Sequence, residues 1–273
     1  MRTVVISAMG GDIGQAVARV IRDARPDIRI IGVDMATRHA GHCFVDEFRQ
    51  VPSASSAEYK VAIKSIIREF GAAALLLISE PELEMFLGED KDVFGCPVVT
   101  CGKTVLELGM DKLETARQLA SIGIAVPWTV DADIDLPIAL PCIMKPRSGC
   151  GSKFVTIVRD DEEVDFYRSN KSGCIFQELL LPDNQEITCG VYRSLDKKVA
   201  VIQFRRTLVG GMTGGAEVIK DPEIDVMCTK IADAFDLVGS MNVQLRITDK
   251  GPRIFEINPR FSSTVLMRHK LGF

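Results

Sequence analysis

The first hundred residues most constrain the fold, because short apolar runs alternate there with amphipathic segments. The apolar runs cover residues 4–8, 28–33, 74–78 and 98–101, and the amphipathic segments cover 13–25 and 58–70. Apolar runs rich in Val and Ile are typical of strands buried on both faces, which run parallel and are joined by crossover helices. The pattern therefore predicts an α/β domain with a parallel sheet over residues 1–105.

The pattern changes after residue 125. Three prolines and three aspartates follow, a composition typical of a connector: Pro127, Pro137, Pro141, Asp131, Asp133 and Asp135. Strands then succeed one another at 143–145, 154–158, 175–179, 186–192, 199–204, 241–247 and 253–258, with helices only near 160–168 and 222–235. This succession indicates an α+β segment with antiparallel sheets over residues 106–273. A helix that begins after Asp111 and ends at Gly123 opens the segment.

Composition narrows the functional classes. The net charge is −4 and no run of Lys or Arg occurs, which argues against a nucleic-acid or acidic-membrane surface. The eight cysteines include no C-x-x-C pair, so we expect reduced thiols and not a disulfide framework. The first apolar run is too short for a signal peptide or a membrane span. We therefore expect a cytoplasmic protein.

The C-terminal strands carry polar residues on one face. Asn242 and Gln244 alternate with apolar neighbours, and Asp249-Lys250-Gly251 supplies a three-residue hairpin loop. This loop sets Thr248 opposite Pro252, Gln244 opposite Glu256 and Asn242 opposite Asn258. Mg²⁺ prefers oxygen ligands and is usually held by one or two carboxylates together with substrate phosphates. The hairpin thus predicts a metal site, and the solvated face of a half-buried sheet is the alternative.

An upstream loop suits a phosphate. The segment from Lys145 to Lys153 joins two predicted strands and contains Arg147, Gly149, Gly151 and Ser152. Glycines let backbone N–H groups turn toward a phosphate, and Lys145 ends a strand from which it reaches one. The spacing is not that of a Walker A sequence, and an ordinary hairpin loop is the alternative.

Later segments suit the rest of a nucleotide. Gln177-Glu178-Leu179-Leu180 ends a predicted strand, where backbone groups read an adenine edge, and Glu186 accepts from ribose hydroxyls. Arg205 and Arg206 precede a glycine-rich segment at 210–215. An unremarkable strand and a solvated turn are the respective alternatives.

A dinucleotide-binding loop is nearly present at the N-terminus. Residues 10–14 read Gly-Gly-Asp-Ile-Gly between a strand and a helix, and Asp34 ends the next strand 20 residues after Gly14. The first glycine of the fingerprint, however, falls on Met9. A nicotinamide-dependent oxidoreductase is therefore the alternative function from another class.

Taken in order, these motifs resemble those of the ATP-grasp superfamily, and most of all its carbamoyl-phosphate-synthase-like members. The motifs are Asp111-Lys112, Met144-Lys145-Pro146 with its glycine loop, Gln177-Glu178, Glu186, Asn242-x-Gln244 and Glu256-x-Asn258-Pro259-Arg260. The resemblance spans nearly the whole chain. It implies a Rossmann-like domain at 1–105 and an ATP-grasp domain at 106–273, with a small lid at about 126–174 and a metal- and ATP-binding part at 175–273.

The resemblance also implies roles for single residues. Mg²⁺, or Mn²⁺ in its place, is expected on Gln244, Glu256 and Asn258. ATP is expected on Lys112, Lys145, Arg147, Gly149, Gly151, Ser152, Gln177, Glu178, Leu179, Leu180 and Glu186. Catalytic roles fall to Arg260, Lys145 and Arg205, with Arg260 stabilising the phosphoryl group in transfer.

Superfamily members typically phosphorylate a carboxylate with ATP, and an amine or thiol then attacks the acyl phosphate. The partners implied are a small-molecule carboxylate and a nucleophile, with no nucleic acid or membrane, and a homodimer is left open. ATP binding without turnover is a third reading. Carbamoyl phosphate synthases carry a histidine where Met212 stands, so synthesis of carbamoyl phosphate is not expected. Relatives usually continue beyond the equivalent of Phe273, so we expect a more open site or a longer protein.

Overall fold

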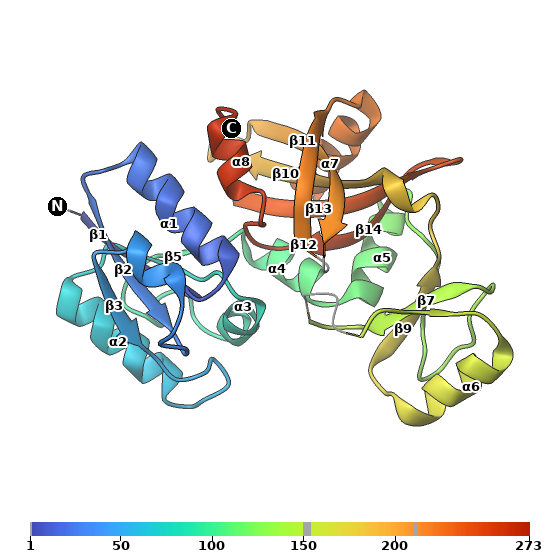
Figure 1. Ribbon diagram of the computed structural model, residues 1–273, viewed down its shortest axis with the longest axis horizontal. Coiled ribbons are helices and arrows are strands. Elements are labelled where there is room, and N and C mark those ends of the chain that lie inside the picture. Colours follow the sequence, from blue (N-terminus) through green and yellow to red (C-terminus); the bar gives the residue numbers. More distant parts are fainter. Residues whose placement is uncertain (1, 150–153, 210–211) are drawn as a thin grey trace.

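A computed structural model describes residues 2–149, 154–209 and 212–273. The elements gather around three sheets (Figure 1). The first sheet is parallel, in the order β3-β2-β1-β4-β5, as the alternating pattern predicted. Its strands are β1 (Arg2–Ile6), β2 (Ile28–Asp34), β3 (Glu47–Gln50), β4 (Ala74–Leu76) and β5 (Val98–Val99). The helices of this part are α1 (Asp12–Ala24), η1 (Ala40–Phe44), α2 (Tyr59–Phe70), α3 (Glu80–Leu87) and α4 (Lys103–Met110).

Both faces of the parallel sheet are buried, which explains its continuous apolar runs. Val5 packs into a core with Ile63 of α2, whereas Ile6 packs on the other face with Val17 of α1. Val265, near the C-terminus, joins the α1 side. Figure 1 accordingly shows α1 and α2 on opposite sides of the sheet, with the last helix, α8 (Val265–Lys270), near α1.

Several short elements were not predicted. They are η1, β3, α3 and α4 in the first part. The start of α3 carries a readable signal, because Ser79 and Glu82 form a reciprocal capping box there. The seven cysteines in the described ranges are free. Within the same ranges, no helix has the length and apolarity needed to cross a membrane.

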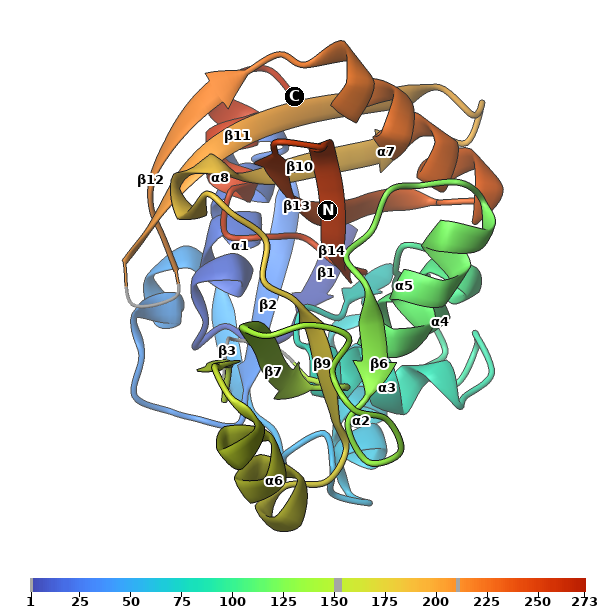
Figure 2. The same ribbon diagram turned by 90° about the vertical axis from the view of Figure 1, so that its right-hand side faces the viewer.

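The second sheet is antiparallel, in the order β6-β9-β7-β8, and carries one helix (Figure 2). Its strands are β6 (Thr129–Asp131), β7 (Cys142–Pro146), β8 (Thr156–Val158) and β9 (Cys174–Glu178), and the helix is α6 (Asp161–Asn170). The connector predicted from the prolines and aspartates therefore needs correction, because β6 lies inside it and pairs with β9. A strand of three residues is too short to leave an alternating pattern.

The third sheet is antiparallel, in the order β12-β11-β10-β13-β14. Its strands are β10 (Glu186–Arg193), β11 (Val199–Val209), β12 (Met212–Ile219), β13 (Gly239–Thr248) and β14 (Gly251–Asn258). The associated helices are α5 (Lys112–Ser121), η2 (Asp183–Gln185) and α7 (Pro222–Ala234). The prediction of antiparallel sheets is confirmed. The strand β12 was missed because its glycines resemble a loop.

In the hairpin β13–β14, the predicted residue pairs distant from the loop are present, but the loop length and the register next to it differ from the prediction. Thr248 lies opposite Gly251, not Pro252, so the loop has two residues instead of three. The register then shifts between Gln244 and Leu245, which is a β-bulge that adds one residue to β14. The shorter loop and the bulge compensate each other. Gln244 therefore does lie opposite Glu256, and Asn242 opposite Asn258.

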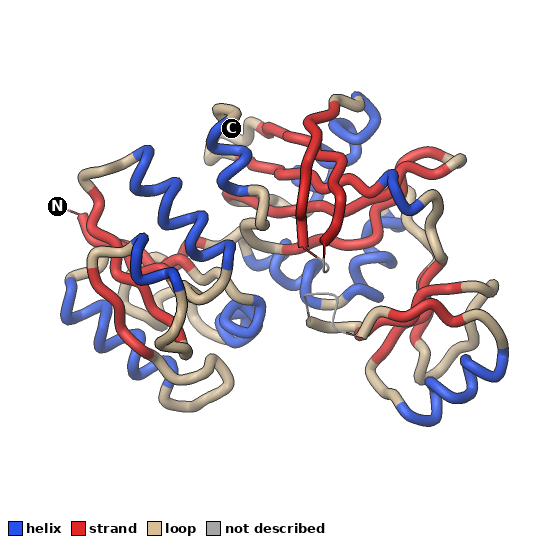
Figure 3. Tube along the Cα trace, viewed as in Figure 1, coloured by secondary structure: helices blue, strands red, loops and turns tan. Residues whose placement is uncertain are grey.

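The helix α4 brings the first part of the chain against the end of β14, between the sheets that Figure 3 shows in red. A Cβ atom on Gly109 of α4 would lie 2.5 Å from Cδ of Pro259 and 3.1 Å from the carbonyl oxygen of Ile257. Real Cβ atoms do not approach other atoms so closely, so this helix–strand contact requires glycine. The contact fixes the position of the segment after β14.

We predict that Gly109→Ala lowers the free energy of unfolding by about 1–3 kcal/mol, because the added methyl group overpacks the contact with Pro259. The matched control is Gly88→Ala, whose Cβ would have its nearest neighbour at 4.0 Å. Urea unfolding of both variants measures the difference. Equal stabilities would contradict the close contact.

Candidate functional site

A cavity of about 650 Å³ lies where β7, β13 and β14 approach α3 and the start of α5. It brings together seven residues predicted from the sequence: Lys112, Lys145, Gly149, Gln244, Glu256, Asn258 and Arg260. Its wall also contains residues that were given no role, from α1, α3 and the segment after β14: Asp12, Glu80, Glu84, Ser262 and Ser263. The candidate site thus spans both parts of the chain.

The polar face of the β13–β14 hairpin forms one wall. Asn258 is only 5% exposed, and its Nδ2 atom has no hydrogen-bond partner in the described ranges. Asn242 differs, since its Oδ1 accepts from Thr188 Oγ1 at 2.9 Å and from Arg268 Nη2 at 3.1 Å. Both amide oxygens are therefore engaged in the protein, since Asn258 Oδ1 accepts from Arg260 Nη2 at 3.4 Å, whereas the Nδ2 donor of Asn258 has no partner in the described ranges.

Arg260 is held by the first part of the chain. Its Nη2 donates to Oε1 of Glu80 at 2.9 Å, and its Nη1 donates to the carbonyl of Phe261 at 3.0 Å. The Arg260 and Glu80 side chains are 14% and 12% exposed. Glu80 stands in the first turn of α3, directly after Ser79, whose hydroxyl donates to the buried Glu82 at 2.7 Å. The capping box thus fixes the helix end that supplies Glu80.

Lys145 is the penultimate residue of β7 and is 6% exposed. Burial lowers the pKa of Lys145 to about 8; the nearby Lys112 lowers it as well, while Glu256 and Glu186 act in the opposite direction. The Nζ atom lies 3.5 Å from the carbonyl oxygen of Phe255 and over that ring. An ammonium that has few protein partners and faces a cavity suits an anionic ligand.

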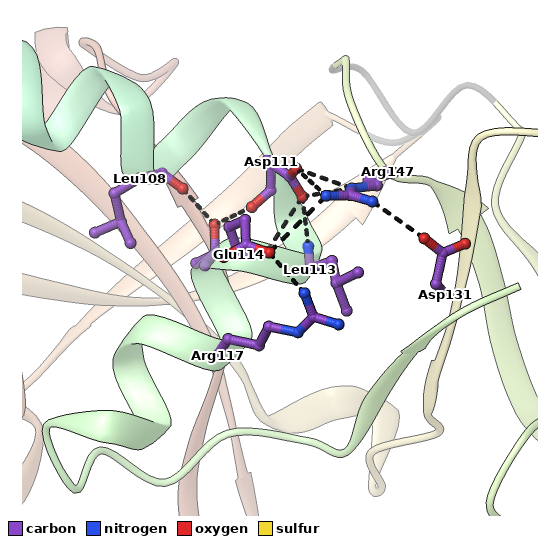
Figure 4. A network of polar contacts seen from close by, with 8 residues as sticks. Leu108, Asp111, Leu113, Glu114, Arg117, Asp131 and Arg147 are labelled. Atoms are coloured by element: carbon purple, nitrogen blue, oxygen red, sulfur yellow. Dashed lines mark hydrogen bonds and ion pairs between the residues drawn. The ribbon is translucent and has the colours of Figure 1, made fainter. Parts of the chain in front are cut away.

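Lys112 is bonded to the first residues after β7. The Lys112 backbone N–H donates to the carbonyl of Arg147 at 3.0 Å, and its Nζ donates to the carbonyl of Gly149 at 2.6 Å. The Arg147 side chain does not line the cavity. It turns to Asp111 and Asp131, as Figure 4 shows. The predicted residues Gly151 and Ser152 lie outside the described ranges.

The residues predicted to bind adenine lie at the end of β9 and outside the cavity lining. Gln177 is buried, and its Nε2 donates to Thr129 Oγ1 at 3.0 Å. The Glu178 carboxylate accepts from Arg253 at 3.0 Å and from the Trp128 N–H at 3.2 Å. The carbonyl of Leu180, next to Leu179, accepts from Arg246 at 2.6 Å. These polar groups therefore already have protein partners.

Glu186, predicted to hold the ribose, lies between two arginines. Its Oε1 accepts from Arg206 Nε and its Oε2 from Arg246 Nη2, both at 2.9 Å. Arg206 also lines the cavity. Sequence reasoning had given Arg206 no role and had not singled out Arg246. The two strands that carry them flank β10, so each meets Glu186 only through the sheet pairing.

The catalytic role predicted for Arg205 is not supported by its position. Arg205 pairs with Glu217 at 3.2 Å on a partly exposed surface and does not line the cavity. Successive side chains of a strand point to opposite faces, so Arg205 and its neighbour Arg206 cannot both reach the site. Arg206 is the one that does.

The N-terminal glycine loop is held by hydrogen bonds to Asp34. Asp34, whose carboxylate would bind ribose in a dinucleotide site, accepts from the Gly10 N–H at 2.7 Å and the Ala36 N–H at 2.8 Å. Asp12 and Ile13, at the start of α1, reach the cavity. The loop therefore meets the site through the helix start.

Solved structures of a synthetase and of a ligase share this fold. The chain superposes on an ADP complex of N5-carboxyaminoimidazole ribonucleotide synthetase with a TM-score of 0.77 and 18% identity, covering 95% of this chain and 70% of that one. An L-amino acid ligase from Bacillus licheniformis gives a TM-score of 0.75 at 16% identity, with 97% and 69% covered.

Residues 110–264, more than half of the chain, match the family model of the ATP-grasp domain, and the chain belongs to this family. It is 26% identical over 147 residues to the D-alanine–D-alanine ligase of Phocaeicola vulgatus, covering 48% of this chain and 44% of the relative. It is 24% identical over 276 residues to the carbamoyl phosphate synthase large chain of Halobacterium salinarum, covering 90% and 26%. The chain thus spans less than half the length of these curated relatives.

We predict that Lys145→Met raises the free energy of unfolding near neutral pH. A folded-state pKa of about 8, against the ordinary value of 10.5, corresponds to about 3 kcal/mol. Between pH 8 and 10.5 the unfolded parent binds more protons than the folded one, so the parent gains stability as pH rises and the advantage of Lys145→Met shrinks.

Urea unfolding of both proteins between pH 7 and 10.5 measures this difference. Lys230→Met, which removes an exposed lysine, is the control. A difference between Lys145→Met and the parent that stays constant with pH would contradict the burial of the charge.

Proposed function

We propose that the protein is an ATP- and Mg²⁺-dependent ligase that phosphorylates a carboxylate, after which an amine or another nucleophile attacks the acyl phosphate. The observation that carries the proposal is the cavity, in which Lys112 and Lys145 face Glu256, Asn258 and Arg260. Cations from two elements stand opposite oxygen ligands from a hairpin, an arrangement suited to a metal-bound polyphosphate. Membership of the ATP-grasp family supports the same activity.

The proposed metal ligands are Gln244, Glu256 and Asn258. They offer one carboxylate and two amide oxygens, a hard donor set that leaves coordination positions for phosphates and water, so the residues present fit Mg²⁺ or Mn²⁺. A bound cation would neutralise charge on the phosphates. The Nδ2 of Asn258, which has no partner in the described part of the chain, is a donor that a phosphate oxygen would satisfy.

The chemistry asks the protein mainly for positioning and charge. A carboxylate oxygen of the substrate attacks the γ-phosphorus, the bond to the β–γ bridging oxygen breaks, and ADP leaves. The nucleophile then attacks the acyl carbon, and phosphate departs with the former carboxylate oxygen. We assign Lys145 and Lys112 to the ATP phosphates, and Arg260 to the transferring phosphoryl group.

The nucleoside is proposed to lie along residues 177–180 and Glu186. Since Glu178 already pairs with Arg253, adenine recognition falls mainly to backbone groups of Leu179 and Leu180. The Leu180 carbonyl accepts from Arg246 and keeps a second lone pair. A carboxylate accepts about four hydrogen bonds, so Glu186 retains capacity for ribose hydroxyls. The proposed parts of the chain are the Rossmann-like domain at 1–105 and the ATP-grasp domain at 106–273, with the lid at 126–174 and the metal-binding part at 175–273.

The two other readings have less support. A nicotinamide-dependent oxidoreductase would need the Asp34 carboxylate for ribose, but Asp34 holds its own loop. A binding module without turnover would not need a complete set of Gln244, Glu256 and Asn258 beside Arg260.

We predict that Glu256→Gln lowers the rate of ADP release about 100-fold, because it removes the carboxylate from the proposed metal ligands. ADP release is first screened over small carboxylates and amino acids, with and without amines, and the variant is assayed with the best acid. Glu107→Gln, which changes an exposed carboxylate on α4, is the control. Parental turnover by Glu256→Gln would refute the metal assignment.

We also predict that oxygen-18 in the carboxylate of the accepted acid appears in the released phosphate, one atom for each turnover. The label moves because the acyl carbon–oxygen bond breaks in the second step. Mass spectrometry of the phosphate checks it, and phosphate without label would exclude an acyl phosphate.

A further inference from the structure

Arg147 forms an ionic clamp between three segments of the chain (Figure 4). Its Nε lies 2.9 Å from both carboxylate oxygens of Asp111, and its Nη2 lies 2.7 Å from Oδ2. Its Nη1 donates to Asp131 of β6 at 3.1 Å. The clamp therefore joins the end of β7, the N-terminus of α5 and the edge strand of the second sheet.

Arg147 and Asp111 do not line the cavity themselves, but their neighbours in the chain do. Along the chain, Arg147 stands between Pro146 and Ser148, and Asp111 stands between Met110 and Lys112; these four neighbours all line the cavity. A guanidinium whose fork is turned to two carboxylates has little capacity left for a phosphate. The sequence prediction that Arg147 binds the nucleotide is thus replaced by a different role.

We propose that Arg147 is a positioning residue, which acts through Asp111 to hold Lys112 and residues 148–149 where they can engage the nucleotide phosphates. The inference rests on the proposed function and assigns Arg147 and Asp111 a part in it. The backbone bond from Lys112 to Arg147 and the side-chain bond from Lys112 to Gly149 complete the linkage.

The charge of Asp111 serves the clamp and is not needed for the helix. Asp111 caps α5 by accepting from the N–H groups of Leu113 and Glu114, a role that a neutral side-chain oxygen also fills. Burial alone would raise the pKa of Asp111, but the Arg147 guanidinium and these N–H groups lower it below the ordinary value. The carboxylate therefore stays ionised for Arg147 at neutral pH.

This separation of roles allows a clean test with the full chain. Asp111→Asn keeps the cap and weakens the clamp, Arg147→Gln removes it from the other side, and Arg147→Lys keeps the charge without the fork. The matched control is Asp221→Asn. Asp221 caps α7 through the same two bonds, to Glu223 and Ile224, and makes no ion pair in the described ranges.

The measurements are the Kd for Mg-ATP by calorimetry and the Kd for adenosine by competition. We expect Asp111→Asn and Arg147→Gln each to weaken Mg-ATP about three- to tenfold, while the double variant is no weaker than either single one. Arg147→Lys should be intermediate. The Kd for adenosine should stay parental in the clamp variants, because only phosphate contacts are displaced. Both Kd values should stay parental in Asp221→Asn.

Three results would count against the inference. Unchanged Mg-ATP affinity in both single variants would overturn it. An equal loss for adenosine would show that the clamp only supports the fold, and so would an equal loss in Asp221→Asn. A parent chain that binds no Mg-ATP would overturn the proposed function itself, which distinguishes the two failures.

Discussion

The pairing of β13 with β14 is the constraint on which the candidate site depends. A one-residue slip would turn Glu256 and Asn258 away from the face that Gln244 occupies, because side chains alternate along a strand. The two-residue loop alone would produce that slip, and the bulge beside Leu245 removes it. Bulges of this kind re-aim side chains near functional sites. After the hairpin, Gly109 lets α4 contact Pro259 closely. This contact also fixes the position of the segment that carries Arg260.

The candidate site also depends on an ion pair between the two parts of the chain. Arg260 and Glu80 are 180 residues apart, and both are mostly buried, so their pairing requires α3 and the segment after β14 to meet in one arrangement. A buried pair of this kind contributes little net stability, since desolvation offsets most of the attraction. It does specify geometry, because either partner left alone would be an uncompensated charge. The Glu82 capping box, which Ser7 and Tyr59 also reach, fixes the helix end that presents Glu80.

The sequence predicted what periodicity and local chemistry control. The parallel sheet, the antiparallel sheets and most helices follow from apolar spacing. The hairpin register was correct at the pair of Gln244 and Glu256 only because a misjudged loop and an unseen bulge cancelled. Short elements such as β6 escaped notice, and β12 was hidden by its glycines. Long-range partners were beyond reach. Nothing local in the sequence reveals that Arg147 turns to Asp111, that Arg246 meets Glu186, or that Arg205 faces away while Arg206 faces in.

The arrangement of charges around the cavity explains why such a site tolerates Lys145. Burial makes the ammonium costly, as its lowered pKa shows, and Glu256 compensates only in part. An anion bound beside Lys145 would restore the ordinary preference for the charged form, so part of the burial cost would return as binding energy. Arg260 and Arg147 differ in that each has a carboxylate partner and is satisfied within the protein. At the cavity, the ammonium of Lys145 is thus a charge without a close carboxylate partner in the described ranges, and the paired charges of Arg260 and Arg147 help to fix the segments around it.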